Sequence, residues 1–177
     1  LGELLKSVII ASANDSAVAL AEYLCGAEEA FVRRMNERAQ ELGLENTHYV
    51  NCTGLPAQGH YTTARDVAKL SAHLDEHPLY YQYSTIWMDE ILHRGGRVTG
   101  LTNTNRLIRF YPDCDGYKTG STNEAKYCIS ATAKKEGMRL IAVVLGALVL
   151  AGLYAILNDT VMPTVTQKIT EMFSYNG

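Results

Sequence analysis

Hydrophobic residues recur at helical spacing in the first half of the chain. The clearest case is Glu28 to Leu42, whose apolar residues follow one another at steps of three and four: Phe31, Val32, Met35, Ala39 and Leu42. Further helices are predicted over Leu4 to Ile10, Asp15 to Leu24 and Ala64 to Leu74. The first of these is predicted to end near Ser12 and the second at Gly26, and the third to begin at Thr62 or Thr63. Residues 46–59 and the stretch from Pro78 carry turn residues and are predicted to be irregular.

The second half of the chain carries the signature of strands. Lys126 to Lys134 and Met138 to Leu145 flank Glu136-Gly137, which predicts a hairpin with a tight turn. Asn103 to Phe110 is predicted to be a strand or extended chain. Met138 to Leu145 is apolar enough to be expected buried on both faces. Helices followed by strands predict an α+β fold.

A long apolar run follows that hairpin. Leu140 to Leu157 contains 18 uncharged residues, which reaches the length of a membrane span. A strand followed by a buried helix explains the run equally well. Beyond Pro163, apolar residues at helical spacing predict a short amphipathic helix: Val165, Ile169, Met172 and Phe173.

Composition is that of an ordinary globular protein. The chain has 177 residues, of which 47% are hydrophobic and 20% charged, enough for one domain with a core. A net charge of -3 provides no basic field for nucleic acid, so no nucleic-acid partner is expected. The four cysteines form no C-x-x-C pair and the five histidines form no H-E-x-x-H motif. We therefore expect no metal site and no cofactor.

Two short motifs carry candidate chemistry. Ser12-Ala13-Asn14 lies at the start of a predicted helix, and Lys118-Thr119-Gly120 lies just before a predicted strand, followed by Ser121 and Thr122. Serine acyl-transfer enzymes that act on D-alanyl peptides and β-lactams use S-x-x-K, then S-x-N, then K-T-G. Each triplet alone has an ordinary alternative, in which Ser12 caps the following helix and Lys118 is an exposed hairpin lysine.

Longer stretches extend the match. The sequences IIASANDSAVALAEYL, EAFVRRMNERAQELGLENTHYVNCTGL, YTTARDVAKL, NTNRLIRFYP, DGYKTGSTNEAKYCISATA and MRLIAVVLGA resemble the low-mass penicillin-binding proteins, and more narrowly the serine D-alanyl-D-alanine carboxypeptidases of sporulating, Gram-positive-type bacteria. The resemblance implies a β-lactamase/DD-peptidase (transpeptidase-like) fold, here incomplete, with a helical subdomain followed by antiparallel strands. It divides the chain into a partial catalytic domain, 1–147, and an atypical apolar segment with a short helix, 148–177.

The resemblance also implies an activity and its residues. The enzyme would remove the terminal D-alanine from peptidoglycan stem peptides, a step in cell-wall synthesis and remodelling that is linked to cell shape and sporulation. Ser12 would pass a proton to the leaving amine, and Asn14 would position the substrate through its amide. Lys118 would hold a positive charge beside the oxyanion and the substrate carboxylate. The implied substrate-binding residues are Thr119 through its hydroxyl, Gly120 at the strand edge, Ser121 through its backbone N–H, and Thr122.

The chain departs from the family pattern at two places. None of its serines has a lysine three residues on, so we expect the nucleophile of S-x-x-K to precede Leu1 and the chain alone to be inactive. A second hypothesis makes Ser12 the nucleophile and Lys118 its base. Ala147 to Leu157 contains no cation, where the family carries an arginine. Without the family's N-terminal strands, Met138 to Leu145 would expose an unpaired edge.

Location and partners follow from the same resemblance. The expected place is outside the cytoplasm, at the cell wall or the outer face of the membrane. The expected partners are a stem peptide ending in D-Ala-D-Ala and, for a longer parent, β-lactams, with membrane association through Leu140 to Leu157. Two alternatives remain: a β-lactamase-like hydrolase of the same fold, and a non-catalytic module that binds peptidoglycan or a membrane.

Overall fold

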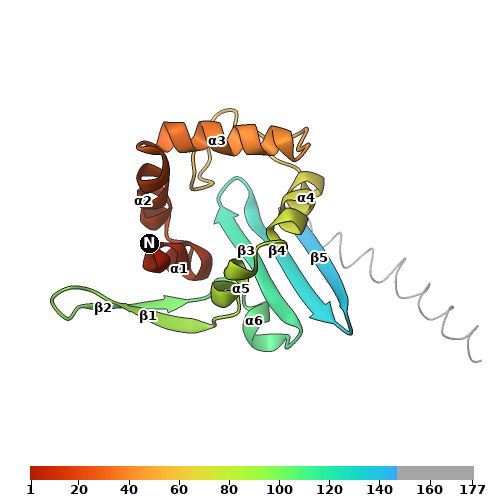
Figure 1. The fold of residues 1–177 in the computed structure, drawn as a ribbon. Helices are drawn as coiled ribbons and strands as arrows, with labels where there is room; N and C mark the ends of the chain where they lie inside the picture. Colours follow the sequence, from red (N-terminus) through yellow and green to blue (C-terminus); the bar gives the residue numbers. More distant parts are fainter. Residues whose placement is uncertain (147–177) are drawn as a thin grey trace, which may run out of the picture. The chain divides into compact units, whose positions relative to one another are not determined.

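Three helices follow one another at the start of the chain (Figure 1). The computed structural model describes residues 1–146, and its first elements are α1 (Gly2–Ala11), α2 (Asn14–Cys25) and α3 (Glu28–Glu41). Each packs on the next, α1 against α2 and α2 against α3. The three helices predicted from periodicity are therefore confirmed, with α1 starting two residues earlier than expected. Residues 1–145 form one compact unit, and a second unit begins at residue 146.

Left-handed residues end the first two helices. Gly26 has φ 80° and donates its N–H to the Glu22 carbonyl, as expected for a glycine after a helix. Ser12 takes the same role after α1 with φ 58° and ψ 39°, donating its N–H to the Ser7 carbonyl. Since a side chain is disfavoured in this region, Ser12 is a strained position rather than an ordinary turn residue.

Helix α4 (Ala64–Leu74) begins at Thr63, one of the two predicted caps. The Thr63 hydroxyl accepts the Asp66 N–H at 3.2 Å. The buried Asp66 carboxylate in turn accepts the Asn46 N–H at 2.8 Å and the Thr47 hydroxyl at 2.9 Å. This carboxylate joins the turn-rich segment after α3 to the first turn of α4.

Removing the cap is expected to weaken this junction. Thr63→Ala should lower the free energy of unfolding by about 1 kcal/mol, because the Asp66 N–H loses its acceptor. Thr63→Ser keeps a hydroxyl and should stay close to wild type. Urea denaturation followed by circular dichroism measures both, and equal stability of the alanine and serine variants would show that the hydroxyl contributes nothing.

The stretch from Pro78 to Phe110 is more regular than predicted. It contains α5 (Pro78–Ser84), the antiparallel hairpin β1 (Met88–Leu92) and β2 (Val98–Thr102), and α6 (Leu107–Phe110). The prediction of an irregular segment from Pro78 is wrong, because proline fits the first turn of a helix, where its missing N–H has no partner to lose. The strand or extended chain predicted over Asn103 to Phe110 is also wrong, because the segment contains no strand and ends in α6.

The second sheet contains β3 (Cys114–Thr122), β4 (Lys126–Lys135) and β5 (Met138–Leu145), antiparallel in that order. The predicted hairpin is confirmed, and Glu136 (φ 50°) and Gly137 (φ 80°) make its turn. The Lys118 triplet lies within β3, not before it. Helix α4 packs on β4 and β5, where the Ser71 and Ser130 hydroxyls meet at 2.7 Å.

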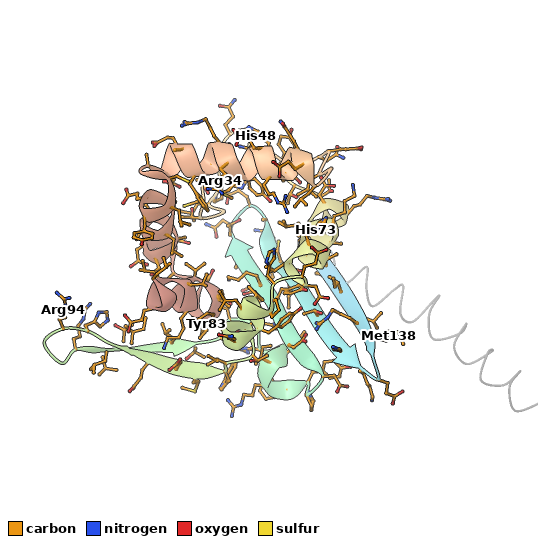
Figure 2. All side chains as sticks on the ribbon, in the orientation of Figure 1. Arg34, His48, His73, Tyr83, Arg94 and Met138 are labelled. Carbon is orange, nitrogen blue, oxygen red and sulfur yellow. The ribbon has the colours of Figure 1, made fainter. Side chains whose placement is uncertain are left out.

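Strand β5 is not buried on both faces, which corrects the prediction from its composition. Exposure alternates along it: Met138 and Leu140 are 63% and 67% exposed, whereas Arg139 points inward. Figure 2 shows Met138 at the outer end of the strand. Within residues 1–146, β5 pairs only with β4, so the expected unpaired edge is confirmed there.

The apolar run beginning at Leu140 starts as a strand. Its residues up to Leu145 belong to β5, and those from 147 lie outside the described residues, as does the short helix predicted after Pro163. Among residues 1–146, no helix combines the length and the apolar character needed to cross a membrane. A small core joins α1 to the first hairpin, with Ile10 packed against Ile91 and Leu101.

Candidate active site

Ser12 and Asn14 lie at the junction of α1 and α2. Both side chains are exposed, and Asn14 is the first residue of α2. The cap of α2 is Ala13, without any side-chain hydrogen bond, so the alternative in which Ser12 caps this helix is wrong. The N–H groups of Ser12 and Ala13 both point back to the Ser7 carbonyl, at 3.3 Å for Ala13. This turn presents the Ser12 side chain at a strained, solvent-facing position.

Lys118 is held differently from a surface lysine. Its side chain is half-buried in β3, and Nζ donates to the Thr119 carbonyl at 2.9 Å. No carboxylate of residues 1–146 forms an ion pair with it. Burial without a counter-charge lowers the pKa of Lys118 to about 8. The alternative of an exposed hairpin lysine is therefore wrong.

The residues after Lys118 alternate across β3. Lys118 lies opposite Ser130, whose hydroxyl faces α4, and Thr119 lies opposite Ile129. Because side chains alternate along a strand, Thr119 and Ser121 point to the other face from Lys118. Thr122 has a local role, since its hydroxyl accepts the Ala125 N–H at 2.9 Å within the turn.

Thr104 connects the two motifs; it lies in the family-like stretch NTNRLIRFYP, but the sequence predicted no role for it. Its N–H donates to the Ile10 carbonyl at 3.1 Å, two residues before Ser12. Its hydroxyl oxygen accepts the Thr119 hydroxyl at 2.7 Å. The end of α1 and strand β3, separated by about a hundred residues in sequence, are thus joined through one residue.

Two buried asparagines flank Thr104. Asn103 donates its amide to the carbonyls of Ser84 (3.0 Å) and Ile86 (2.8 Å). Asn105 donates to the Gly116 carbonyl on β3 at 3.1 Å. The Asn103 side-chain oxygen also accepts the Asn105 N–H at 2.9 Å. In the sequence, this arrangement is indicated by the Asn-x-Asn spacing. Asparagine side chains that become buried need hydrogen-bond partners, and backbone groups supply them here.

An ionic network joins β3 to the end of α4 and to β5. Arg139 of β5 contacts Asp75 at 2.7 Å and Asp115 at 2.9 Å, and donates to the Thr132 hydroxyl at 2.8 Å. Its guanidinium lies 4.8 Å from the ring centre of Tyr81. Tyr81 donates a hydrogen bond to Asp75, and its hydroxyl lies 3.0 Å from that of Tyr117, the residue before Lys118. The network joins α4, α5 and all three strands of the second sheet.

A separate groove of about 290 Å³ lies along α3 and contains none of the motif residues. It is lined by Phe31, Arg34, Met35, Arg38, Ala39, Leu44, Tyr49 and Leu70. Figure 2 shows Arg34 on α3. Within residues 1–146, no three His, Cys, Asp or Glu side chains are grouped to hold a metal ion.

Two family patterns match the chain. The pattern described as D-alanyl-D-alanine carboxypeptidase matches residues 1–148. A family of unknown function matches residues 130–177, so the two overlap on part of β4 and on β5. The overlap covers the point at which the resemblance to carboxypeptidases ends.

Curated relatives carry the same name as the first pattern. D-alanyl-D-alanine carboxypeptidase DacF of Bacillus subtilis is 49% identical over 145 residues, which are 82% of this chain and 37% of DacF. DacC of Escherichia coli is 42% identical over 82% of this chain and 36% of its own length. The chain thus spans little more than a third of these relatives.

Solved structures agree with the fold. D-alanyl-D-alanine carboxypeptidase DacD of Francisella tularensis superposes with a TM-score of 0.76 at 28% identity, over 82% of this chain and 47% of that one. Penicillin-binding protein D2 of Listeria monocytogenes, in its cefotaxime-bound form, gives 0.71 at 34% identity, over 82% and 58%. The expected DD-peptidase-like fold is confirmed for the part of the chain that the structure describes.

Proposed function

Because the chain belongs to the D-alanyl-D-alanine carboxypeptidase family, we propose that residues 1–147 supply two walls of a carboxypeptidase active site. Ser12 and Asn14 form one wall, and Lys118, Thr119, Gly120 and Ser121 form the other. The substrate is a peptidoglycan stem peptide ending in D-Ala-D-Ala, and the reaction is acylation of a serine, release of D-alanine and hydrolysis. The observation that carries the proposal is the hydrogen-bonded connection of the two walls through Thr104.

Lys118 fits a site for an anionic substrate. The Lys118 ammonium is half-buried and has lost part of its hydration. Among residues 1–146, no carboxylate pairs with it to compensate for this loss. A substrate carboxylate would restore the missing counter-charge, and a developing oxyanion would do so more strongly. Lys118 therefore favours a peptide with a free C-terminal carboxylate over a peptide whose C-terminus is amidated.

The outer edge of β3 fits an extended peptide. Within residues 1–146, β3 pairs only with β4, which leaves its other edge open. We infer that the Thr119 carbonyl, which accepts a hydrogen bond from the Lys118 ammonium, faces this edge. Since the N–H and C=O of one residue face the same way in an antiparallel strand, the Ser121 N–H, two residues on, faces it too. Ser121 can then donate to the oxyanion, and Gly120 adds no side chain between them.

Ser12 and Asn14 complete the arrangement from the helical side. The Ser12 hydroxyl is exposed and is not used to cap α2, so it is available to pass a proton to the leaving amine. The exposed Asn14 amide is available for a peptide carbonyl. Thr122 belongs to the turn of the β3–β4 hairpin, and its contribution to substrate binding is indirect.

The same proposal places the protein outside the cytoplasm, where peptidoglycan lies, and makes β-lactams ligands of the complete site. The names of the relatives and the cefotaxime-bound structure support it. The domain limit near residue 147 is supported by the family match, which ends at residue 148. The proposed membrane association through Leu140 to Leu157 concerns a run that begins within β5 and continues beyond it.

Fluorescent penicillin tests the proposal directly. The 177-residue chain, which contains no S-x-x-K motif, should not be labelled. The same chain preceded by the part of DacF that lies before the matched region should be labelled and should release D-alanine from diacetyl-L-lysyl-D-alanyl-D-alanine. Labelling of the chain alone would show that it contains its own nucleophile. A folded joined protein that is neither labelled nor active would overturn the proposed function.

A further inference from the structure

We infer that Thr104 is a positioning residue of the substrate site. It orients the Thr119 hydroxyl and sets the distance between the two walls. The inference rests on the proposed function and deepens it. Thr104 connects Thr119 to the end of α1, two residues before Ser12, because its N–H donates to the Ile10 carbonyl at 3.1 Å and its hydroxyl accepts the Thr119 hydroxyl at 2.7 Å. A side chain that bonds in this way to Thr119 restricts the rotation of Thr119 about its first side-chain bond.

The support for Thr104 is rigid. Asn103 and Asn105 are 4% and 1% exposed, and each donates to backbone carbonyls of packed elements. The Asn105 bond ends on Gly116, two residues before Lys118. Buried amides that satisfy backbone groups on both sides fix the backbone of the residue between them. Thr104 is therefore held in place by its neighbours, not by its own side chain.

The Thr104 side chain is exposed, so its role is not to fill the core. An exposed threonine between two buried asparagines contributes little apolar contact, so its hydroxyl can be removed at small cost in stability. What the hydroxyl does contribute is a contact with a residue of the substrate-binding wall. Its loss should therefore change ligand binding more than folding.

The direction of the hydrogen bond gives Thr104 a specific task. In the structure Thr119 donates its only hydroxyl proton to Thr104. A substrate carboxylate accepts hydrogen bonds only, so it must replace Thr104 as the acceptor of the Thr119 hydroxyl. The Thr104 hydroxyl can then turn and donate to the Thr119 oxygen, which strengthens Thr119 as a donor. Thr104 accepts the Thr119 hydroxyl in the structure and would donate to the Thr119 oxygen when a substrate carboxylate is bound.

The test uses Thr104→Val, which keeps the shape, and Thr104→Ser, which keeps the hydroxyl. In the 177-residue chain, three-bond NMR couplings should show one Thr119 side-chain rotamer in wild type and in the serine variant, and averaging in the valine variant. In the protein joined to the DacF segment, the valine variant should raise KM for diacetyl-L-lysyl-D-alanyl-D-alanine about tenfold with kcat within twofold. The serine variant should keep both values within twofold.

A peptide whose terminal carboxylate is an amide is the matched control, because Thr119 has no carboxylate to bind there. Its KM should be the same for wild type and the valine variant. Unchanged Thr119 couplings in the valine variant would overturn the inference, as would a KM effect of equal size on both peptides. An inactive joined wild-type protein would count against the proposed function, and the Thr119 couplings of the chain would still decide the role of Thr104.

Discussion

Lys118→Met is expected to raise the free energy of unfolding at pH 7 by about 2–3 kcal/mol while removing the function of the site. The reason is the cost of a buried, unpaired cation, which lowers the pKa of Lys118 to about 8 from 10.5 in the unfolded chain. Methionine fills a similar volume without charge and loses one hydrogen bond, that to the Thr119 carbonyl. In the protein joined to the DacF segment, penicillin labelling should slow by roughly 10²–10³.

The pH dependence identifies the cause. Below pH 8 Lys118 is protonated in both states and its burial is fully unfavourable; above pH 10.5 it is neutral in both. Between these values the unfolded chain binds more protons, so the stability of wild type rises with pH relative to Lys118→Met. Urea denaturation of both proteins at several values from pH 7 to 10 should show their difference shrinking. A difference that stays constant with pH would assign the effect to packing alone.

Arg139→Met is expected to lower the free energy of unfolding by about 2–3 kcal/mol. The substitution leaves the carboxylates of Asp75 and Asp115 without the cation they share, and both are partly buried. Repulsion and lost hydrogen bonds should then loosen the contact between the end of α4 and the second sheet. Thermal and urea denaturation of the 177-residue chain measure the change.

Arg94→Met is the matched control for this variant. Arg94 lies in the exposed loop of the β1–β2 hairpin, as Figure 2 shows, and its replacement should change stability by less than about 0.5 kcal/mol. Adding Asp75→Asn and Asp115→Asn to Arg139→Met should recover part of the loss, because the unpaired charges disappear. If the triple variant is no more stable than Arg139→Met, the carboxylates are not the source of the effect.

Local patterns predicted most of the regular structure. The apolar spacing in Glu28–Glu41, the glycine after Cys25 and the hairpin around Glu136-Gly137 depend on neighbours within a few residues, and all three features are present. The missed elements are short: α5 and α6 have 7 and 4 residues. Helices of that length have little periodicity of their own and form where packing against β3 supports them.

The burial of β5 shows why composition can mislead. Its apolar residues predicted a strand covered on both faces, but α4 covers only one, and the strand lies at the edge of the sheet within residues 1–146. Coverage of the second face depends on elements far away in sequence. The single inward-pointing charge, Arg139, was the signal that one face has polar partners.

By itself the sequence determined the family, the α+β order of elements and the two motifs, since each of these is written in short stretches that keep their meaning in any context. Only the tertiary structure decided that Ser12 is a strained, exposed turn residue, that Lys118 is half-buried without a counter-charge, and that Thr104 joins their two walls. The Ser12 conformation is set by a turn that bonds back to Ser7, whereas the Thr104 connection joins Ile10 to Thr119 and the pKa of Lys118 follows from its burial in the folded protein.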